Sequence, residues 1–526
     1  MTFTRSWTLL LAAALGLASA SAQESWSPAR QKLTPAVQRA LGSGASTVRV
    51  LIRMRGQRGS APVGQLSAAD AAVRMALRRE EARRAAAVLL SELASRPLAS
   101  SKATPLAPGV RASVVPAAPT PRAQELWIAN SVLVDADPAL IRELAGRSDV
   151  ERIYRDVRIQ AIPRQELLRK AGASALAAGS SWAVDKVRAR EAWSKFGGRG
   201  EGVVIGHIDT GVDAAHPALD GRVLRFKDFV NGKTAAYDDE GHGTHTAGSI
   251  CAGGDGIGVA PGARLIVAKA LDAEGSGELS KLLAAMQWML DPDGNPSTND
   301  RPAIVSCSWG VDRKQMKDIG SEDTFFWDAV QAWRDADMLP VFASGNAGPG
   351  AEIIPAAYPI ALAVGATDLA DAAPGFSTGA ETAWNGVTYT KPDLAAPGHG
   401  ILSTAPGGQM RSLNGTSMAC PVVAGIAALI KQARPRATAS EIERLLITGA
   451  VDLGEPGKDT RFGLGRVDAL ASVTAASATV APAPAPTPVV RPAPSTGSDA
   501  VKTRLARGVL MLVVGLVAAF GLQLFF

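Results

Sequence analysis

The chain has 526 residues, of which 47% are hydrophobic and 20% are charged. This composition excludes an intrinsically disordered protein, and the length exceeds that of one ordinary domain. Three cysteines allow at most one bridge, which excludes a disulfide scaffold. The net charge of +6 is unevenly divided: residues 23–180 hold 24 basic and 13 acidic residues (+11), whereas residues 181–475 hold 26 and 35 (−9). Two complementary surfaces are therefore favoured over a nucleic-acid-binding protein.

Residues 1–22 have the pattern of a secretory signal peptide. Arg5 supplies the positive charge, Leu9–Leu17 the apolar stretch and Ala20–Ala22 a small-residue cleavage site. Because the apolar stretch is short for a permanent membrane helix, we expect cleavage near Ala22 and export of the chain.

Residues 23–180 predict a small α+β module. A long Ala/Arg/Glu-rich stretch indicates a helix, and β-branched runs indicate strands. A Pro/Ala/Ser-rich stretch at about 97–122 is typical of a loop. The expected elements are strands at Val48–Met54, Leu126–Val134 and Val150–Ile162, and helices at Ser67–Ser95 and Pro138–Gly146.

Residues 181–475 alternate short apolar runs with helical patterns. This alternation predicts an α/β fold, a doubly wound parallel sheet with helices on both faces. The expected strands are Val203–Ile208, Leu265–Leu271, Ala303–Cys307, Pro340–Ala343 and Ala361–Ala366, with helices such as Leu279–Leu290 and Glu322–Asp335.

The tail has two parts. Residues 476–507 are rich in Ala, Pro, Thr and Ser, which is typical of an extended linker. Gly508–Phe526 is a run of 19 residues without a charge, long enough to nearly span a bilayer, so we expect a transmembrane anchor. Basic residues before this run oppose the positive-inside tendency; they are Lys502, Arg504 and Arg507.

The first chemical motif is Val203–Pro217 (VVIGHIDTGVDAAHP). An apolar strand ends at Asp209, and Gly211 permits a sharp turn after it. An acid at the carboxyl end of a parallel strand lies where such sheets bind ligands. An aspartic protease also uses Asp-Thr-Gly, but it would need a second copy of this motif, and the chain has none.

The second motif is Asp239–Gly248 (DEGHGTHTAG). Its two histidines could be metal ligands, but a zinc helix would need Glu where Gly243 stands. We therefore interpret His242 as a general base and His245 as a packed structural residue. Asp213 and His216 of the first motif are also interpreted as structural.

The third motif is Asn414–Gly425 (NGTSMACPVVAG). Gly415 allows a tight turn into a helix, with Ser417 at the helix N-terminus and Pro421 early enough to be tolerated. The helix dipole there favours developing negative charge. A Ser/Thr helix cap is the simpler explanation of this motif alone, but it does not account for the other two motifs.

In the order Asp209, His242, Ser417, the three motifs resemble those of the subtilisin-like serine peptidases. Further segments across residues 181–475 agree: Trp182–Trp193, Val259–Pro261, Ser308–Gly310, Ala343–Asn346 and Lys391–Gly398. The resemblance implies a catalytic triad that hydrolyses protein or peptide substrates through an acyl-enzyme. The end of the preceding module resembles a prodomain, which implies an inhibitor that the precursor removes by cutting itself near residues 160–181.

The resemblance also implies the surroundings of the triad. The Asn346 side chain and the Ser417 backbone N–H would bind the oxyanion. The substrate would be flanked by Ser308, Trp309 and Gly310 on one side and by Ser344 and Gly345 on the other. Because Ser344–Ala347 holds no carboxylate and Trp309 is apolar, we expect an apolar residue before the cut.

No cofactor is required by this chemistry. Subtilisins often bind a tight calcium with an acid in His-Pro-Asp-Leu, but Ala218 occupies that place and the stretch His245–Pro261 is short. The family's tight site is therefore not expected, and weaker calcium sites stay open. Metal or nucleophilic roles for Cys251, Cys307 and Cys420 have no supporting histidine motif, so we expect these thiols to be packed in the core.

Two other functions fit the sequence less well. An esterase or lipase would need a Gly-x-Ser-x-Gly elbow with the serine before the histidine, which this chain lacks. A catalytically silent binding protein with the subtilase fold would lack a triad or oxyanion residue, and all four are present.

Overall fold

The computed structural model describes residues 29–56, 68–96, 123–161, 181–254, 256–295, 298–318 and 324–478. Several predicted segments lie outside the described residues: the signal peptide, the loop at 97–122, the processing segment after Ala161, nearly all of the linker, and the membrane anchor. The described part of residues 23–180 is called the N-terminal module below, and residues 181–478 the parallel-sheet domain.

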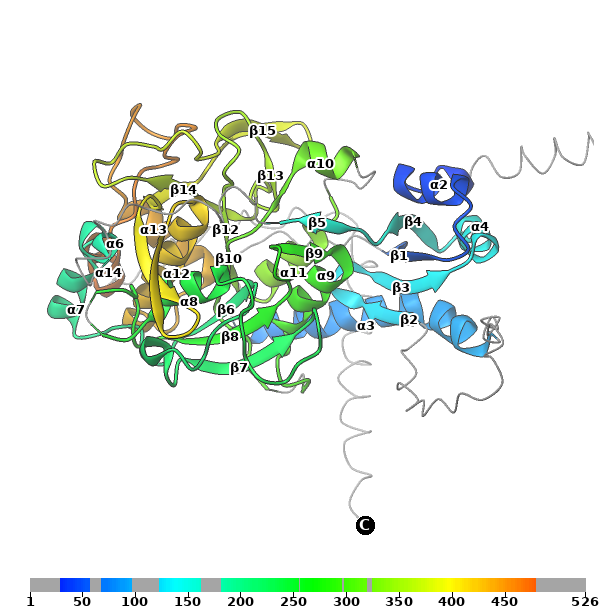
Figure 1. Cartoon of the computed structure of the whole chain (residues 1–526), viewed down its shortest axis with the longest axis horizontal. Coiled ribbons are helices and arrows are strands. Elements are labelled where there is room, and N and C mark those ends of the chain that lie inside the picture. Colours follow the sequence, from blue (N-terminus) through cyan, green and yellow to red (C-terminus); the bar gives the residue numbers. More distant parts are fainter. Residues whose placement is uncertain are drawn as a thin grey trace, which may run out of the picture. The chain divides into compact units, whose positions relative to one another are not determined.

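The N-terminal module is built on an antiparallel four-stranded sheet in the order β2-β3-β1-β4 (Figure 1). Its core joins Val50 and Ile52 of the sheet to Leu89 and Ile141 of two helices. The elements are α2 (Pro35–Gly42), β1 (Val48–Met54), α3 (Ala68–Ser95), β2 (Ala123–Leu126), β3 (Ser131–Ala136), α4 (Pro138–Gly146), β4 (Val150–Arg155) and β5 (Arg158–Gln160).

Two predicted strands of this module are each divided in two. The strand expected at 150–162 is β4 and β5, which belong to different sheets, and the strand expected at 126–134 is divided between β2 and β3. The run at 126–134 is broken by a short 3-10 helix, η1 (Trp127–Ala129), and by Asn130, whose φ of 47° is left-handed. This turn folds β3 back on β2, with Leu126 opposite Ser131. Asparagine adopts the left-handed region more readily than most residues, so Asn130 favours a turn at this point. The apolar residues on either side of Asn130 nevertheless have the pattern of one continuous strand.

The parallel-sheet domain holds seven strands in the order β17-β14-β12-β10-β6-β8-β7, all parallel. The order reverses between β6 and β10. The chain adds β8 and β7 on one side of β6 and the later strands of this sheet on the other side. The strands are β6 (Val204–Asp209), β7 (Val223–Asp228), β8 (Arg264–Lys269), β10 (Ile304–Cys307), β12 (Leu339–Ala343), β14 (Leu362–Thr367) and β17 (Leu394–Pro397).

Helices cover both faces of this sheet, as alternation in the sequence predicts (Figure 1). Alternate strand residues pack on opposite sides, so Val341 joins one apolar core and Phe342 the other. The first core packs against α6 (Trp182–Lys186), α7 (Ala189–Phe196), α8 (His242–Cys251), α12 (Thr416–Ala433), α13 (Ala439–Thr448) and α14 (Ala469–Ser477); the second packs against α9 (Leu279–Trp288) and α11 (Trp327–Asp335).

Shorter elements surround the carboxyl edge of the sheet. They are η3 (Pro217–Leu219), β9 (Ser276–Glu278), β11 (Val311–Asp312), α10 (Arg313–Asp318), β13 (Ile353–Ile354), β15 (Ala380–Trp384), β16 (Val387–Lys391), β18 (Ile401–Ala405) and β19 (Gln409–Leu413). Within the described ranges, α12 is the one helix long and apolar enough to cross a membrane, and 83% of it is buried inside this domain. Its apolar surface therefore belongs to the core.

The N-terminal module contacts the parallel-sheet domain through apolar packing, backbone pairing and charge. Leu51, Trp127 and Tyr154 of the module join the second apolar core, where Tyr154 packs edge-on against Phe325. Strand β5 pairs antiparallel with β9, and Ala161 continues this pairing by donating to the Gly275 carbonyl (3.1 Å) and accepting from Gly310 N–H (3.1 Å). Four arginines of the module also meet carboxylates of the domain: Arg53 with Asp328, Arg78 with Asp335, Arg79 with Asp291, and Arg158 with Asp272 and Glu274.

Candidate active site

Asp209 is the last residue of β6, at the carboxyl edge where the strand order reverses, and its side chain is fully buried. Its Oδ1 accepts from Nδ1 of His242 and from Thr210 N–H, both at 2.7 Å. Burial raises the pKa of this carboxyl, but the adjacent His242 and the hydrogen bonds outweigh burial and hold the pKa below its usual value. Asp209 is therefore a carboxylate.

His242 is the first residue of α8 and is 1% exposed. A carboxylate can only accept a hydrogen bond, so Nδ1 of the ring carries the proton that binds Asp209. This assigns the neutral tautomer with Nε2 as the basic atom. The backbone N–H of His242 donates to the Glu240 carboxylate (2.6 Å), which fixes the start of the helix.

Ser417 is the second residue of α12 and is 3% exposed. Its hydroxyl donates to the Ser308 carbonyl at 3.2 Å. Pro421 has no N–H, so the Ser417 carbonyl lacks the usual helical donor four residues on, and the Ser308 hydroxyl donates to it instead (2.9 Å). The early proline of the third motif thus ties the helix start to the loop after β10.

Asn346 follows β12 and lies against the start of α12. Its Oδ1 accepts from the Thr416 N–H (2.9 Å) and from the Thr416 hydroxyl (3.1 Å). The same hydroxyl accepts from Gly345 N–H at 3.0 Å. With its oxygen held in this way, the amide presents Nδ2 as its donor group.

The predicted substrate-binding segments lie beside these groups, with one correction. The Gly310 N–H donates to the Ala161 carbonyl, Ser308 exchanges hydrogen bonds with Ser417, and the Ser344 hydroxyl donates to the Thr378 carbonyl (2.8 Å). Trp309, however, is 2% exposed and packs edge-on against Phe326 and Phe342 in the core. Side chains alternate along an extended chain, so Trp309 faces away from the site and contributes no apolar surface to it.

Three residues that the motif analysis left without a role surround Asp209. His207 is fully buried, and its Nε2 donates to the Gly243 carbonyl (3.1 Å), while burial lowers its pKa. The Thr246 hydroxyl lies 3.3 Å from Oδ2 of Asp209. The Thr210 hydroxyl accepts from Gly243 N–H (2.8 Å) and donates to Asp238 (2.9 Å). In the sequence, the feature that could have pointed to these three residues was their position within the first two motifs.

The other histidines of the motifs make structural contacts. Nε2 of His245 donates to the carbonyls of Ile401 and Arg411, and burial lowers its pKa to about 3. Nε2 of His216 donates to the Gln409 carbonyl (2.9 Å), and its Nδ1 accepts from Ala218 N–H (3.1 Å). Asp213 accepts from Gly407 N–H (2.8 Å), so these side chains tie the β18–β19 hairpin to the motifs.

All three cysteines are buried free thiols, in accordance with the predicted packing role. Burial raises the pKa of Cys251 to about 12 and that of Cys420 to about 11, and it also raises the pKa of Cys307. Thiolates are therefore disfavoured in the core.

The residues at the family's calcium position do not fit a calcium ion. Ala218 offers no side-chain oxygen, and its carbonyl accepts from Gly253 N–H (2.6 Å). Within the described ranges, the one acidic group close enough to share a cation is the triplet Asp291, Asp293 and Asp300. The Arg225 guanidinium lies 3.9 Å from Asp293 and 3.7 Å from Asp300, which places a positive charge there already.

Comparison with known proteins shows the family of this chain. The model of the subtilase family matches residues 200–465. The chain is 33% identical to Bacillopeptidase F of Bacillus subtilis (strain 168) over 67% of this chain and 26% of that protein. It is 35% identical to serine protease AprX of the same organism over 52% of this chain and 66% of that protein.

Subtilisin Savinase of Lederbergia lenta is 36% identical over 55% of this chain and 97% of its own length. The chain thus spans about a quarter of Bacillopeptidase F and just under two thirds of AprX, but almost all of the shorter subtilisin. The matched region contains every residue of the site described above. The chain belongs to the subtilase family of serine peptidases.

Proposed function

We propose that this subtilase is a serine endopeptidase that hydrolyses peptide bonds with Asp209, His242 and Ser417 as its triad. The observation that carries the proposal is the 2.7 Å hydrogen bond between the Asp209 carboxylate and Nδ1 of His242. Both side chains are buried, at the place where the strand order of the sheet reverses. This bond holds the imidazole in the tautomer that a general base needs.

Each side chain has a role that follows from its chemistry. The Ser417 oxygen attacks the peptide carbonyl carbon while its proton passes to Nε2 of His242. The protonated imidazole then donates that proton to the leaving amine as the C–N bond breaks, which leaves an acyl-enzyme. Water, deprotonated by His242, then attacks the ester carbonyl. The imidazolium returns a proton to the Ser417 oxygen as the C–O bond of the ester breaks, which restores the serine and releases the acid product. The Asp209 carboxylate stabilises the imidazolium in both halves of the reaction.

The oxyanion forms beside two donors in this proposal. Asn346 offers Nδ2, because Thr416 holds its oxygen on the opposite side. The backbone N–H of Ser417 lies in the first turn of α12, where N–H groups lack helical partners and the helix dipole is positive. Donors fixed in this way stabilise developing charge without reorganisation.

The test is the Ser417→Ala variant together with a serine-directed phosphonyl reagent. We expect the variant to lose peptide hydrolysis and the reagent to label Ser417 of the active protein. Ser95→Ala changes an exposed serine of α3 that is far from Ser417 in the sequence, and it is the control for expression and folding. Near-full activity of Ser417→Ala would refute the mechanism, and a folded wild-type chain without activity would favour the silent binding protein.

We also propose that the N-terminal module is a prodomain that inhibits the enzyme until the precursor cuts itself between Ala161 and Ser181. The pairing of β5 with β9 supports this, because it delivers the chain to Gly310, two residues from the Ser308 carbonyl that accepts from Ser417. The Asp156 carboxylate supports it too, since it accepts from the N–H (3.0 Å) and the hydroxyl (2.7 Å) of Ser280 at the start of α9.

The precursor tests this second proposal. We expect the Ser417→Ala precursor to accumulate uncut in a host that lacks other proteases, whereas the wild-type precursor is processed. Isolated residues 23–165 should inhibit the mature enzyme, and more weakly as salt rises. The reason is that their 22 basic and 12 acidic residues give a net charge of +10, which attracts the −9 of residues 181–475. Normal processing of the Ser417→Ala precursor would make the module a permanent domain.

Export and membrane attachment are proposed from the sequence. Residues 1–22 fit a signal peptide, and residues 508–526 fit a membrane anchor behind a Pro-rich linker. We expect the protein to partition with membranes and truncation at about residue 500 to release a soluble active enzyme. A soluble protein that retains its C-terminus would contradict the anchor, and loss of the tail in the soluble form would make it a transient processing signal.

A further inference from the structure

The side chain of the substrate residue before the cut must enter between two loops. One loop is Ser308–Gly310, which holds the peptide backbone through Gly310 N–H and contacts the Ser417 hydroxyl through Ser308. The other is Ser344–Asn346, which carries the amide beside the oxyanion position. This assignment rests on the proposed peptidase function.

Ile353 fills the gap between these two loops. A Cβ added to Gly310 would overlap Cγ2 of Ile353, and a Cβ added to Gly345 would overlap its Cγ1, so both loops lack side chains where this isoleucine enters. The pairing of β11 with β13, with Asp312 opposite Ile353, fixes the backbone of the residue. Its 9% exposure shows that it is packed against its neighbours.

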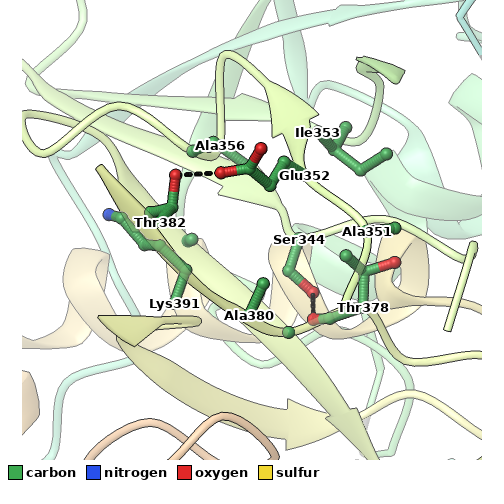
Figure 2. A pocket seen from close by; sticks show the side chains of 12 residues that line it. Ser344, Ala351, Glu352, Ile353, Ala356, Thr378, Ala380, Thr382 and Lys391 are labelled. Carbon is green, nitrogen blue, oxygen red and sulfur yellow. Dashed lines mark hydrogen bonds between the residues drawn. The ribbon is translucent and has the colours of Figure 1, made fainter. Parts of the chain in front are cut away.

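The space beyond Ile353 is small (Figure 2). Figure 2 shows Ile353 among the side chains that line a cavity. The cavity volume is about 10 Å³, which is close to the space one water molecule needs. Most of the lining is small or aliphatic: Ser344, Ala351, Ala356, Ala357, Ala363, Thr378, Gly379 and Ala380. No aromatic side chain fits there without displacing Ile353.

A carboxylate also lines this cavity, but it is already paired. Glu352 accepts from Nη1 of Arg313 at 2.8 Å and from the Thr382 hydroxyl. A basic substrate side chain would have to pass Ile353 and then compete with Arg313 for Glu352. Charge therefore gives no advantage to Lys or Arg before the cut.

We propose that Ile353 truncates this subsite, so that the enzyme cuts after small residues such as Ala, Gly and Ser rather than after large apolar or basic ones. This narrows the apolar preference expected from the sequence. The chain carries such residues itself: between residues 171 and 180, within the segment where processing is proposed, every residue except Leu176 is Ala, Gly or Ser.

The experiment compares mature wild-type enzyme with Ile353→Ala on peptides that differ only in the residue before the cut, which is Ala, Leu, Phe or Lys. For wild type we expect kcat/KM for Ala to exceed that for Phe at least about 10-fold, the size of effect that pocket fit gives. Ile353→Ala should raise the ratio of kcat/KM for Phe to kcat/KM for Ala about 10-fold or more. Ile353→Val, which keeps a branched side chain in the gap, should retain the wild-type order.

Each outcome decides one question. Wild-type preference for Phe, Leu or Lys over Ala overturns the inference even if no variant folds. An unchanged Phe-to-Ala ratio in a folded, phosphonyl-labelled Ile353→Ala enzyme overturns the role of Ile353. Absence of any cleavage and of labelling in the wild type refutes the peptidase itself. Sequencing of the mature N-terminus adds an independent check, because a cut after Ala, Gly or Ser supports the preference.

Discussion

The interior of the parallel-sheet domain and its contact with the N-terminal module differ in their share of salt-sensitive contacts. Apolar residues form a core on each face of the sheet. The contact also has apolar packing, because Leu51, Trp127 and Tyr154 of the module join the second core. To this packing the contact adds a strand pair and partly exposed ion pairs; the Arg78 and Arg79 side chains are 28% and 24% exposed.

This difference teaches which contacts salt can weaken. Apolar burial contributes about 25 cal/mol per Å² and is not screened by salt. Partly exposed ion pairs contribute little each and weaken with ionic strength. Salt should therefore weaken the ion pairs between the module and the domain, while the apolar packing in the domain and at the contact persists.

The largest effect is expected inside the parallel-sheet domain. Asn346→Ala removes a proposed oxyanion donor, and we expect kcat to fall about 10²–10³-fold, the loss known for the equivalent change in a subtilisin. KM should change little, because the donor acts mainly in the transition state. Asn346→Asp is the matched variant of similar shape, and it should also fail because it brings a negative charge to the oxyanion. A kcat within about 3-fold of wild type for Asn346→Ala would remove this residue from the mechanism.

A smaller effect is expected at the contact. The double change Arg78→Ala and Arg79→Ala in the full precursor removes two ion pairs with α11 and with Asp291, each worth about 0.5–1 kcal/mol. We expect the cut module to dissociate about 5- to 30-fold faster, measured as the lag before activity appears. At about 1 M salt, where charges are screened within about 3 Å, the double variant and the wild type should show nearly the same lag.

The control for this change is Arg84→Ala, because Arg84 pairs with Glu80 on its own helix rather than with the other domain. An equal lag for the double variant and the wild type at low salt would show that the strand pair and apolar packing hold the module alone.

Acid should weaken the parallel-sheet domain through its buried histidines. The pKa of His245 is lowered to about 3, and that of His207 is also lowered, so between about pH 6.5 and 4.5 the unfolded chain binds protons that the folded chain does not. The contribution of these neutral rings to the free energy of unfolding is fully present above about pH 6.5. It is lost as the pH falls, by at most about 1.4 kcal/mol per pH unit for each histidine.

Denaturant unfolding of Ser417→Ala between pH 8 and 4.5 measures this slope without self-digestion. His245→Gln keeps an N–H donor but cannot titrate, so it should flatten the profile. Stability that rises as the pH falls through this window would contradict the assignment of neutral buried rings.

The smallest effect is expected from calcium removal. Ala218 lacks a ligand at the family's tight site, so chelation should lower Tm by less than about 3 °C, about the shift that 1 kcal/mol gives for a domain of this size. Chelator already loaded with calcium is the control. A large fall in Tm would show that another site in the chain binds the ion.

The residues of the proposed triad could be picked out from the sequence because each belongs to a local signal. Asp209 ends an apolar strand, His242 begins a helix after a glycine, and Ser417 lies in the first turn of a helix that also follows a glycine. Helix α4 was predicted with its observed bounds, since Asp137 caps it and Pro138 begins it. Such signals depend on neighbours within a few residues, which the sequence displays directly.

What only the tertiary structure decided depends on residues far apart in the chain. Ile353 closes the gap beside Gly310, Trp309 turns into the core between two phenylalanines, and Arg78 reaches Asp335. No local pattern specifies these partners, because close packing between distant segments sets them only after the strands have assembled. The sequence by itself determined the family fold and the residues of the proposed triad. Packing between distant segments decided the position of Ile353 at the proposed substrate site, and it decided which apolar residues and ion pairs join the N-terminal module to the parallel-sheet domain.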